Sequence, residues 1–167
     1  MSLPFAHVSF MPYKTFAGSL DATGLRIGVL VSRFNQFITE ALAQGAFATL
    51  EKHGCAPENI TVVKVPGAWE LPLAAKTLAA RCDAIIAIGA VVRGDTPHFD
   101  YVAAGASNGL SQTSLQTGVP IAFCVLTTND MQQAMDRAGG KSGNKGAEAA
   151  EVAIELANLM KQLKDQS

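Results

Sequence analysis

The sequence predicts an α/β protein in which helices cover both faces of a central, mostly parallel four-stranded sheet. Two observations predict this class. From residue 25 onward, short apolar runs alternate with segments of helical periodicity, and the run "AIIAIGAVV" (84–92) is apolar throughout. Strands that alternate with helices form parallel sheets, and a strand covered on both faces shows no polar alternation. Right-handed crossovers are expected between successive strands.

Four apolar runs are the expected strands. They are residues 25–34, 59–65, 84–92 and 119–128. The earlier segment "YKTFAGSL" (13–20) is a candidate for an additional N-terminal edge strand. The sequence has no internal repeat, low-complexity tract or linker, so residues 14–167 are expected to form a single domain, preceded by an N-terminal extension of residues 1–13.

Helices are expected after the first two strands. Asn35 is positioned to cap a helix that ends at Gly54. Apolar residues spaced three and four apart from Leu71 to Cys82 indicate a second helix, directly after "PGAWE".

The C-terminal half predicts three more helices. One spans residues 97–117 and is closed by Gly118, and "NDMQQAMDRAGG" is a short one. The glycine- and lysine-rich break "GGKSGNKG" then precedes a long final helix. The apolar face of that helix is expected at Ala149, Val152, Ala153, Leu156, Leu159 and Leu163.

The composition favours self-association over binding to nucleic acid. Charged residues are 16% of the chain and apolar residues 49%, whereas a charged share of about 25% is usual. A monomer would have too little charged surface to cover itself, so we expect a homo-oligomer. The net charge of −1 and the scattered Lys and Arg give no basic stripe for nucleic acid.

The sequence predicts a cytoplasmic protein. The apolar run at 84–92 has about half the length that a membrane-spanning helix needs, and the N-terminus lacks the features of a signal peptide. Cys55, Cys82 and Cys124 have neither metal-binding spacing nor a disulfide pattern. We expect them to be core residues in a reducing compartment.

Ligands of a parallel α/β sheet bind outside the carboxyl ends of its strands. The loops after the four expected strands are "SRFN", "PGAWE", "VVRGDTPH" and "TTND". The short motifs of this chain with the most unusual combinations of side chains fall in these loops. This clustering predicts a small-molecule site at the carboxyl edge of the sheet.

The segment "RGDTPHFDY" is the candidate for anion binding and proton transfer. Thr96 is an expected helix N-cap, with Pro97 as the first helical residue. A helix start offers free N–H groups and a positive dipole end to a phosphate. His98 would lie beside that anion and can move protons near neutral pH. Ordinary helix capping, with His98 as an exposed first-turn residue, is the alternative.

Aromatic and acidic residues in the other loops suit a polar planar ligand. Phe34 can stack on a heterocycle, and Glu70 can accept hydrogen bonds from hydroxyls. Core packing is the alternative for Phe34, Trp69 and Phe123, and for Glu70 it is a favourable position at a helix start. The residues alone leave these alternatives open.

Basic residues flank the glycine-rich break. Arg137 suits bidentate phosphate binding and Lys145 supplies a point charge, although solvated helix ends also attract basic residues. The break is not a P-loop, because it follows a helix and lacks the required spacing. The sequence shows no metal triad, Cys–His pair, serine nucleophile elbow or dinucleotide fingerprint.

The segments "SRFNQFIT", "VPGAWELPLAAK", "GAVVRGDTPHFDYVA", "GVPIAFCVLTT" and "RAGGKSGNKGAEAA" occur in this order without gaps. Together they resemble the lumazine synthase family, from about Tyr13 to Leu163. The resemblance implies a flavodoxin-like three-layer sandwich and a transferase of riboflavin biosynthesis. Its substrates would be 5-amino-6-(D-ribitylamino)uracil and 3,4-dihydroxy-2-butanone 4-phosphate. The products would be 6,7-dimethyl-8-ribityllumazine, phosphate and water, with no cofactor or metal.

The resemblance also implies a role for each matching residue. His98 would be the catalytic proton carrier, and Phe34 would stack on the pyrimidine ring. Arg137 would grip the phosphate together with backbone amides at Asp95 and Thr96. The other implied substrate-binding residues are Ala68, Trp69, Glu70, Ala90, Val91, Val92 and Phe123, with Asn35 and Lys145 as further candidates.

Members of the family assemble as pentamers, and many as icosahedral shells of pentamers. The resemblance therefore implies sites between neighbouring subunits, with Phe123 and Arg137 supplied by the partner chain. The compact "GGKSGNKG" is similar to the shell-forming type.

Two points qualify the resemblance. A non-catalytic flavin- or lumazine-binding protein, or a purely structural shell module, would use the same scaffold. Keeping both His98 and Arg137 argues against storage, because holding a ring without a phosphate needs neither. Trp69 is bulkier than the Phe expected at this position, so the ribityl end of the pocket would be tighter.

Overall fold

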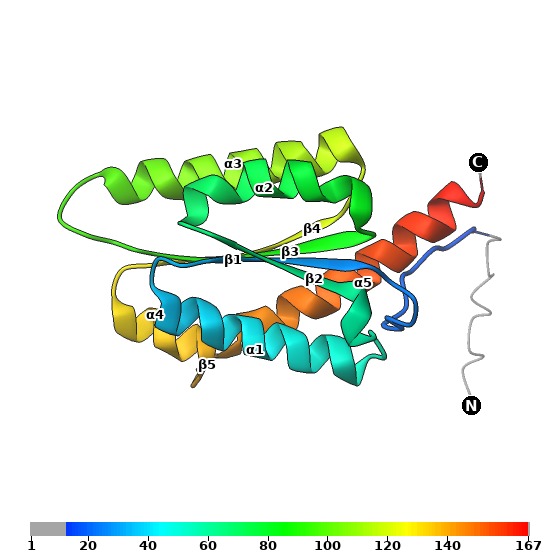
Figure 1. Cartoon of the computed structure of the whole chain (residues 1–167), viewed down its shortest axis with the longest axis horizontal. Helices are drawn as coiled ribbons and strands as arrows, with labels where there is room; N and C mark the ends of the chain where they lie inside the picture. Colours follow the sequence, from blue (N-terminus) through cyan, green and yellow to red (C-terminus); the bar gives the residue numbers. More distant parts are fainter. Residues whose placement is uncertain (1–12, 167) are drawn as a thin grey trace, which may run out of the picture.

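The computed structural model describes residues 13–166 and has three layers, with a parallel sheet between two layers of helices (Figure 1). The strands are β1 (Ile27–Ser32), β2 (Ile60–Val65), β3 (Ala84–Val92) and β4 (Ile121–Thr128). They lie in the order β2-β1-β3-β4, and each neighbouring pair is parallel. The predicted α/β class, with a flavodoxin-like sandwich, is confirmed. Of the predicted N-terminal extension, residues 1–12 lie outside the described residues.

Two helices cover one face of the sheet and three cover the other (Figure 1). The helices are α1 (Gln36–Lys52), α2 (Leu71–Leu78), α3 (His98–Thr117), α4 (Met131–Arg137) and α5 (Lys145–Lys164). Short 3-10 turns are η1 (Pro57–Asn59), η2 (Ala68–Glu70) and η3 (Ala79–Arg81). The glycine-rich break folds into a hairpin of β5 (Ala138–Gly140) and β6 (Gly143–Asn144). None of the helices in residues 13–166 is long and apolar enough to cross a membrane.

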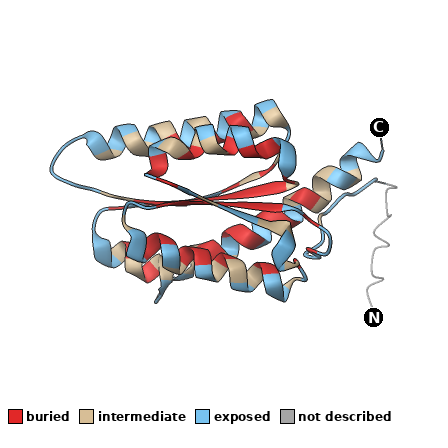
Figure 2. Cartoon of the chain, viewed as in Figure 1, coloured by how far each residue is buried: buried red, intermediate tan, exposed pale blue. Residues whose placement is uncertain are grey.

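The sheet separates two apolar clusters, because successive side chains of a strand point to opposite faces. Ile86 and Ile88 of β3 belong to the cluster under α1 and α5, whereas Ile85 and Ala87 belong to the cluster under α2 and α3. Figure 2 shows the central strands of the sheet as buried, and β1 and most of β3 are buried residue by residue. Burial on both faces explains why this strand has an uninterrupted apolar sequence. The free cysteines Cys55, Cys82 and Cys124 are buried in these clusters, as expected.

Residues 13–20 do not form the predicted edge strand. Side chains of α5 instead donate hydrogen bonds to backbone carbonyls of this region. Gln162 Nε2 donates to Ala17 O at 2.9 Å, and Asn158 Nδ2 donates to Ser19 O at 2.9 Å. A strand needs these carbonyls for a neighbouring strand. The prediction is therefore wrong for this chain, whose N-terminal segment runs along the C-terminal helix (Figure 1).

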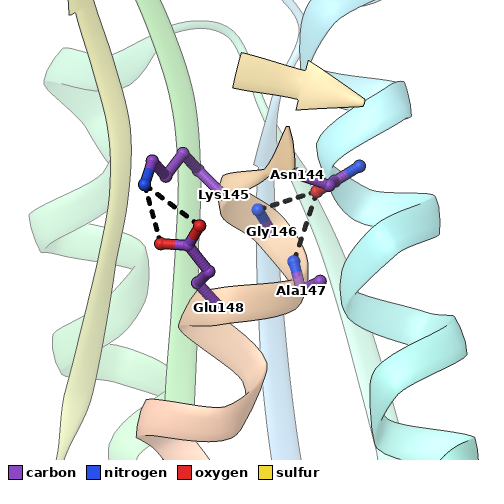
Figure 3. A network of polar contacts seen from close by, with 5 residues as sticks. All are labelled: Asn144, Lys145, Gly146, Ala147 and Glu148. Atoms are coloured by element: carbon purple, nitrogen blue, oxygen red, sulfur yellow. Dashed lines mark hydrogen bonds and ion pairs between the residues drawn. The ribbon is translucent and has the colours of Figure 1, made fainter. Parts of the chain in front are cut away.

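The buried face of α5 also differs from the predicted one. Val152 and Leu163 are exposed. The buried residues are Gly146, Ala149, Ala150, Ala153, Ile154 and Ala157. Because α5 packs against α1 as well as against β3 and β4, small residues allow close approach on two sides. Asn144 fixes its start, since Oδ1 accepts from Gly146 N at 2.8 Å and from Ala147 N at 3.2 Å (Figure 3).

Candidate active site

A cavity of about 680 Å³ opens at the carboxyl ends of the central strands, where the sequence predicts a site. It is lined by the loops after β1 and β2, by the end of β3 and by the start of α3. Nine predicted site residues line it: Phe34, Asn35, Ala68, Trp69, Glu70, Ala90, Val91, Val92 and His98. Gly67, Tyr101 and Val102 also line it and were not predicted as site residues.

Asn35 holds together two walls of this cavity rather than capping a helix with its side chain. Its backbone is left-handed, with φ 56°, and no side-chain cap bond is made to α1. Instead Nδ2 donates to Ala90 O at 2.8 Å. Asn tolerates the left-handed region better than most residues, so the turn into α1 is compatible with it. Asn35 is the N-cap residue of α1, as predicted, although its side chain makes no capping bond.

The turn after β2 presents an aromatic ring and a carboxylate to the cavity. Glu70 Oε2 accepts a hydrogen bond from Gly67 N at 2.9 Å, which fixes the η2 turn. Trp69 is 60% exposed and Phe34 is 69% exposed. Core packing, the alternative for both aromatic residues, is therefore wrong within this chain. Phe34 lies against Gly67, where an added Cβ would meet its Cδ2 at 2.7 Å.

The loop from β3 to α3 projects from the edge of the sheet (Figure 1). Thr96 does not cap α3: the helix begins at His98, and Pro97 is the cap residue, with no side-chain cap bond. Pro97 O accepts from Asp100 N at 3.0 Å, so the backbone makes the first turn. Asp95 and Thr96 are exposed and line neither cavity described here.

Arg93 ties the start of α3 to the neighbouring loop. Its guanidinium lies 4.2 Å from the centre of the Phe99 ring, a cation–π contact. Nη1 lies 3.5 Å from Asp100 Oδ1, and Nε donates to Asn129 Oδ1 at 3.4 Å. The residues on both sides of this loop are therefore held while Asp95 and Thr96 stay open to solvent.

His98 is the first residue of α3 and faces the cavity together with Tyr101 and Val102. The three residues are spaced i, i+3, i+4 and so share one face of the helix. This spacing was the signal in the sequence that would have identified Tyr101 and Val102. Within residues 13–166 the imidazole of His98 makes no hydrogen bond, so both its nitrogens are free for a ligand.

A second cavity, of about 360 Å³, lies along β4 and the start of α5. It contains three further predicted residues, namely Phe123, Arg137 and Lys145. Phe123 is 49% exposed, so the core-packing alternative is wrong for it as well. Arg137 Nη1 donates to Gln133 O at 3.0 Å. Lys145 Nζ lies 2.8 Å from Glu148 Oε2, within the first turn of α5 (Figure 3).

The second cavity also contains a thiol. Burial raises the pKa of Cys124 to about 12, and the nearby Glu148 carboxylate raises it further than Lys145 lowers it. The thiol is therefore protonated at neutral pH and is a poor nucleophile. No residue lines both cavities, so one chain holds the predicted site as two separate groups.

The fold and these cavities define an α/β protein with a candidate small-molecule site at the carboxyl edge of a parallel sheet. In the part of the chain that the structure describes, no cluster of three or more His, Cys, Asp or Glu is arranged to hold a metal.

Comparison with known proteins identifies the family. The family model for 6,7-dimethyl-8-ribityllumazine synthase matches residues 24–161. Two curated proteins of that name, from Nitratidesulfovibrio vulgaris strains DP4 and Hildenborough, are each 53% identical to this chain over 152 residues. The match covers 90% of this chain and 97% of each relative. The chain belongs to the 6,7-dimethyl-8-ribityllumazine synthase family.

Proposed function

We propose that this protein is a transferase that makes 6,7-dimethyl-8-ribityllumazine, the penultimate step of riboflavin biosynthesis. It condenses 5-amino-6-(D-ribitylamino)uracil with 3,4-dihydroxy-2-butanone 4-phosphate and releases phosphate and water. The family membership and the 53% identity support this reaction. The observation that carries it is the exposed, unpaired imidazole of His98 in the same cavity as Phe34 and Glu70.

The first cavity suits the pyrimidine substrate. Phe34 stacks on the planar ring, and the Glu70 oxygen that does not bind Gly67 accepts hydrogen bonds from ribityl hydroxyls. Ala68 and Trp69 line the ribityl end, and Ala90, Val91 and Val92 line the ring pocket with backbone polar groups. Asn35 keeps these two walls at one spacing through its bond to Ala90 O.

The steps of the reaction need proton transfers at one place. The uracil amine attacks the ketone, a Schiff base forms, phosphate leaves and the second ring closes. His98 carries protons between these groups, since one nitrogen of a neutral imidazole accepts a proton while the other can donate one. Holding both substrates together supplies most of the acceleration, without a covalent intermediate on the protein.

The phosphate is held by a neighbouring subunit. Arg137 and Phe123 line the second cavity, which shares no residue with the first. A complete site therefore forms when the second cavity of one subunit faces the first cavity of another, and Arg137 meets the phosphate near Asp95 and Thr96. Lys145 is a further candidate for this phosphate. The low charged share of 16% supports such self-association.

The assembly is a pentamer, and the compact turn at Lys141 and Ser142 favours an icosahedral shell of pentamers. The native mass of the assembly distinguishes a pentamer from a shell of pentamers. The cytoplasm is the proposed location, supported by three free, buried cysteines.

Mixing both substrates with the purified protein tests the function. We expect the fluorescence of the lumazine product to appear in proportion to protein. Binding of ribitylaminouracil analogues without turnover would indicate storage instead, and no affinity for them would indicate a structural module.

Mixing two inactive variants tests the shared site. His98→Ala and Arg137→Ala chains, unfolded and refolded together, can form sites with one intact half from each. Random mixing restores about one quarter of the wild-type turnover, because each half is intact with even odds. No recovery in a mixed assembly would place His98 and Arg137 of one site on the same subunit.

A further inference from the structure

Trp69 is the single tryptophan of the chain, and its indole lies on α3 beside the first cavity. The turn that carries it, η2, packs against α3. Because the residue is 60% exposed, the indole is held on one side only and has room to move on the other. The position of this ring therefore depends on what it contacts on the helix.

That contact is the backbone at Gly105. A Cβ added to Gly105 would lie 2.6 Å from Trp69 Cε3 and 3.3 Å from Cη2, with Cζ3 nearest of all. These three atoms belong to the six-membered ring of the indole. Non-bonded carbon atoms pack at about 3.5–4.0 Å, so a methyl group at residue 105 and the indole cannot both occupy these positions.

Gly105 also continues the wall that faces the cavity. Tyr101 and Val102, four and three residues earlier, line the cavity from the same face of α3. The indole seated on Gly105 extends this wall by one helical turn. Any displacement of the ring away from α3 changes the space available at that end.

We infer that Gly105 is a positioning residue that seats the Trp69 indole on α3 and thereby sets the width of the cavity where the ribityl chain lies. The inference rests on the proposed function for the identity of the ligand. The position of the Trp69 indole on Gly105 does not depend on the proposed function.

Gly105→Ala tests the inference, with Gly109→Ala as a matched control. Gly109 is one turn further along α3, and a Cβ there would meet Pro72 Cγ at 2.6 Å instead of the indole. Both variants thus crowd the same layer of helices. We expect Gly105→Ala to raise KM for ribitylaminouracil about ten-fold or more, as a methylene does in a tight pocket. KM for the butanone phosphate should stay within about two-fold, and Gly109→Ala should leave both KM values within that range.

Tryptophan fluorescence tests the seating without any assay of turnover. We expect Gly105→Ala to shift the emission to longer wavelength and to increase quenching by acrylamide, because the ring leaves the helix. Gly109→Ala should match the wild type. If no lumazine forms even with the wild type, the proposed function fails, while the difference in fluorescence still decides the position of the ring. Identical emission and quenching in Gly105→Ala and the wild type would overturn the inference.

A second substitution keeps the test decisive if Gly105→Ala does not fold. Trp69→Phe removes the outer ring atoms that the methyl meets, so the double variant should fold. Its KM for ribitylaminouracil should lie within about two-fold of Trp69→Phe alone, which is the non-additivity expected for residues in contact. A double variant whose KM for ribitylaminouracil is as high as that of Gly105→Ala would show that the indole is not the group displaced. This result would equally overturn the inference.

Discussion

The two ends of the parallel sheet use their polar and aromatic side chains in opposite ways. At the amino ends, Arg26 and Asp83 bind each other: Arg26 N donates to Asp83 Oδ2 at 2.8 Å, and the side chains form an ion pair at 2.9 Å. At the carboxyl ends, Trp69 and Tyr101 leave most of their surface exposed, and His98 has no partner within residues 13–166. The Arg26–Asp83 pair is satisfied by the protein itself. At the carboxyl ends Arg93 and Asp100 also pair, but Trp69, Tyr101 and His98 remain available to a ligand.

This difference separates stability from activity. Groups that bind each other contribute to the free energy of unfolding, and groups left without partners contribute to binding and chemistry. Substitutions at the carboxyl edge should therefore change kinetic constants more than stability, and those at the amino edge should do the reverse.

His98→Ala should have the largest effect. Loss of a positioned proton carrier lowers kcat by about 10²–10⁴-fold. The melting temperature and native mass stay as in the wild type, because the imidazole makes no hydrogen bond or ion pair within residues 13–166. Steady-state lumazine fluorescence and calorimetry measure the two quantities. Unchanged turnover would show that His98 does not carry protons in the reaction. A lowered melting temperature would show that a residue of the carboxyl edge contributes to stability, contrary to the difference proposed between the two ends.

Arg137→Ala should come next. Losing a charge-assisted contact raises KM for the butanone phosphate by about 10–100-fold, with little change for ribitylaminouracil. Arg137→Lys keeps the charge but not the two-pronged geometry, so its KM should be intermediate. Lys141→Ala is the control, because that lysine pairs with Asp136 at 3.3 Å and lines neither cavity. Equal rises in KM for both substrates would show that Arg137 does not bind the phosphate specifically.

Asn35 lies at the carboxyl edge, yet its side chain binds the protein itself. Its substitution therefore tests whether stability depends on such bonding and not on the end of the sheet. Asn35→Ala places an unsuited residue at φ 56° and removes the bond to Ala90 O. We expect a loss of about 1–2 kcal/mol in the free energy of unfolding. Asn35→Gly restores the backbone freedom only, so it should recover part of this loss in denaturant titrations. No difference between the two variants would show that backbone conformation contributes nothing.

The smallest effect is expected at the amino edge. Partial burial raises the pKa of Asp83, but hydrogen bonds and charge from Arg26 outweigh it and lower the pKa below the usual range. Asp83 therefore stabilises the fold above its unfolded pKa of about 3.9, and this stabilisation is lost as the pH falls through its folded pKa. Asp83→Asn should reduce the unfolding midpoint slightly at pH 7, less so below about pH 4, and leave kcat unchanged. A midpoint difference that grows in acid would contradict this assignment.

The strands were predictable because burial on both faces leaves a simple signal. All four were predicted to within two residues at each end, and β3 had the predicted bounds. Gly54 and Gly118 mark helix ends as predicted, since both have positive φ. These features depend on local chemistry, which the sequence carries directly.

The errors arose where one residue has two possible partners. Thr96 and Asn35 are both favoured helix caps, but the Asn35 side chain binds a strand 55 residues away and the first turn of α3 uses the Pro97 carbonyl. Residues 13–20 have the composition of a strand, yet Asn158 and Gln162 of α5 bind the backbone there. Such choices depend on which distant groups come close, and no local pattern contains that information.

The hydrogen bond from Asn35 Nδ2 to Ala90 O, at 2.8 Å, joins the turn that holds Phe34 to the strand that ends at Val92. The turn that carries Phe34 is therefore tied to the end of β3 at Ala90, a residue of the buried core. A molecule that pushes on one wall displaces the other in the same direction, so the gap between them is stiff. We expect discrimination against thicker rings to follow from this rigidity rather than from any single repulsive contact.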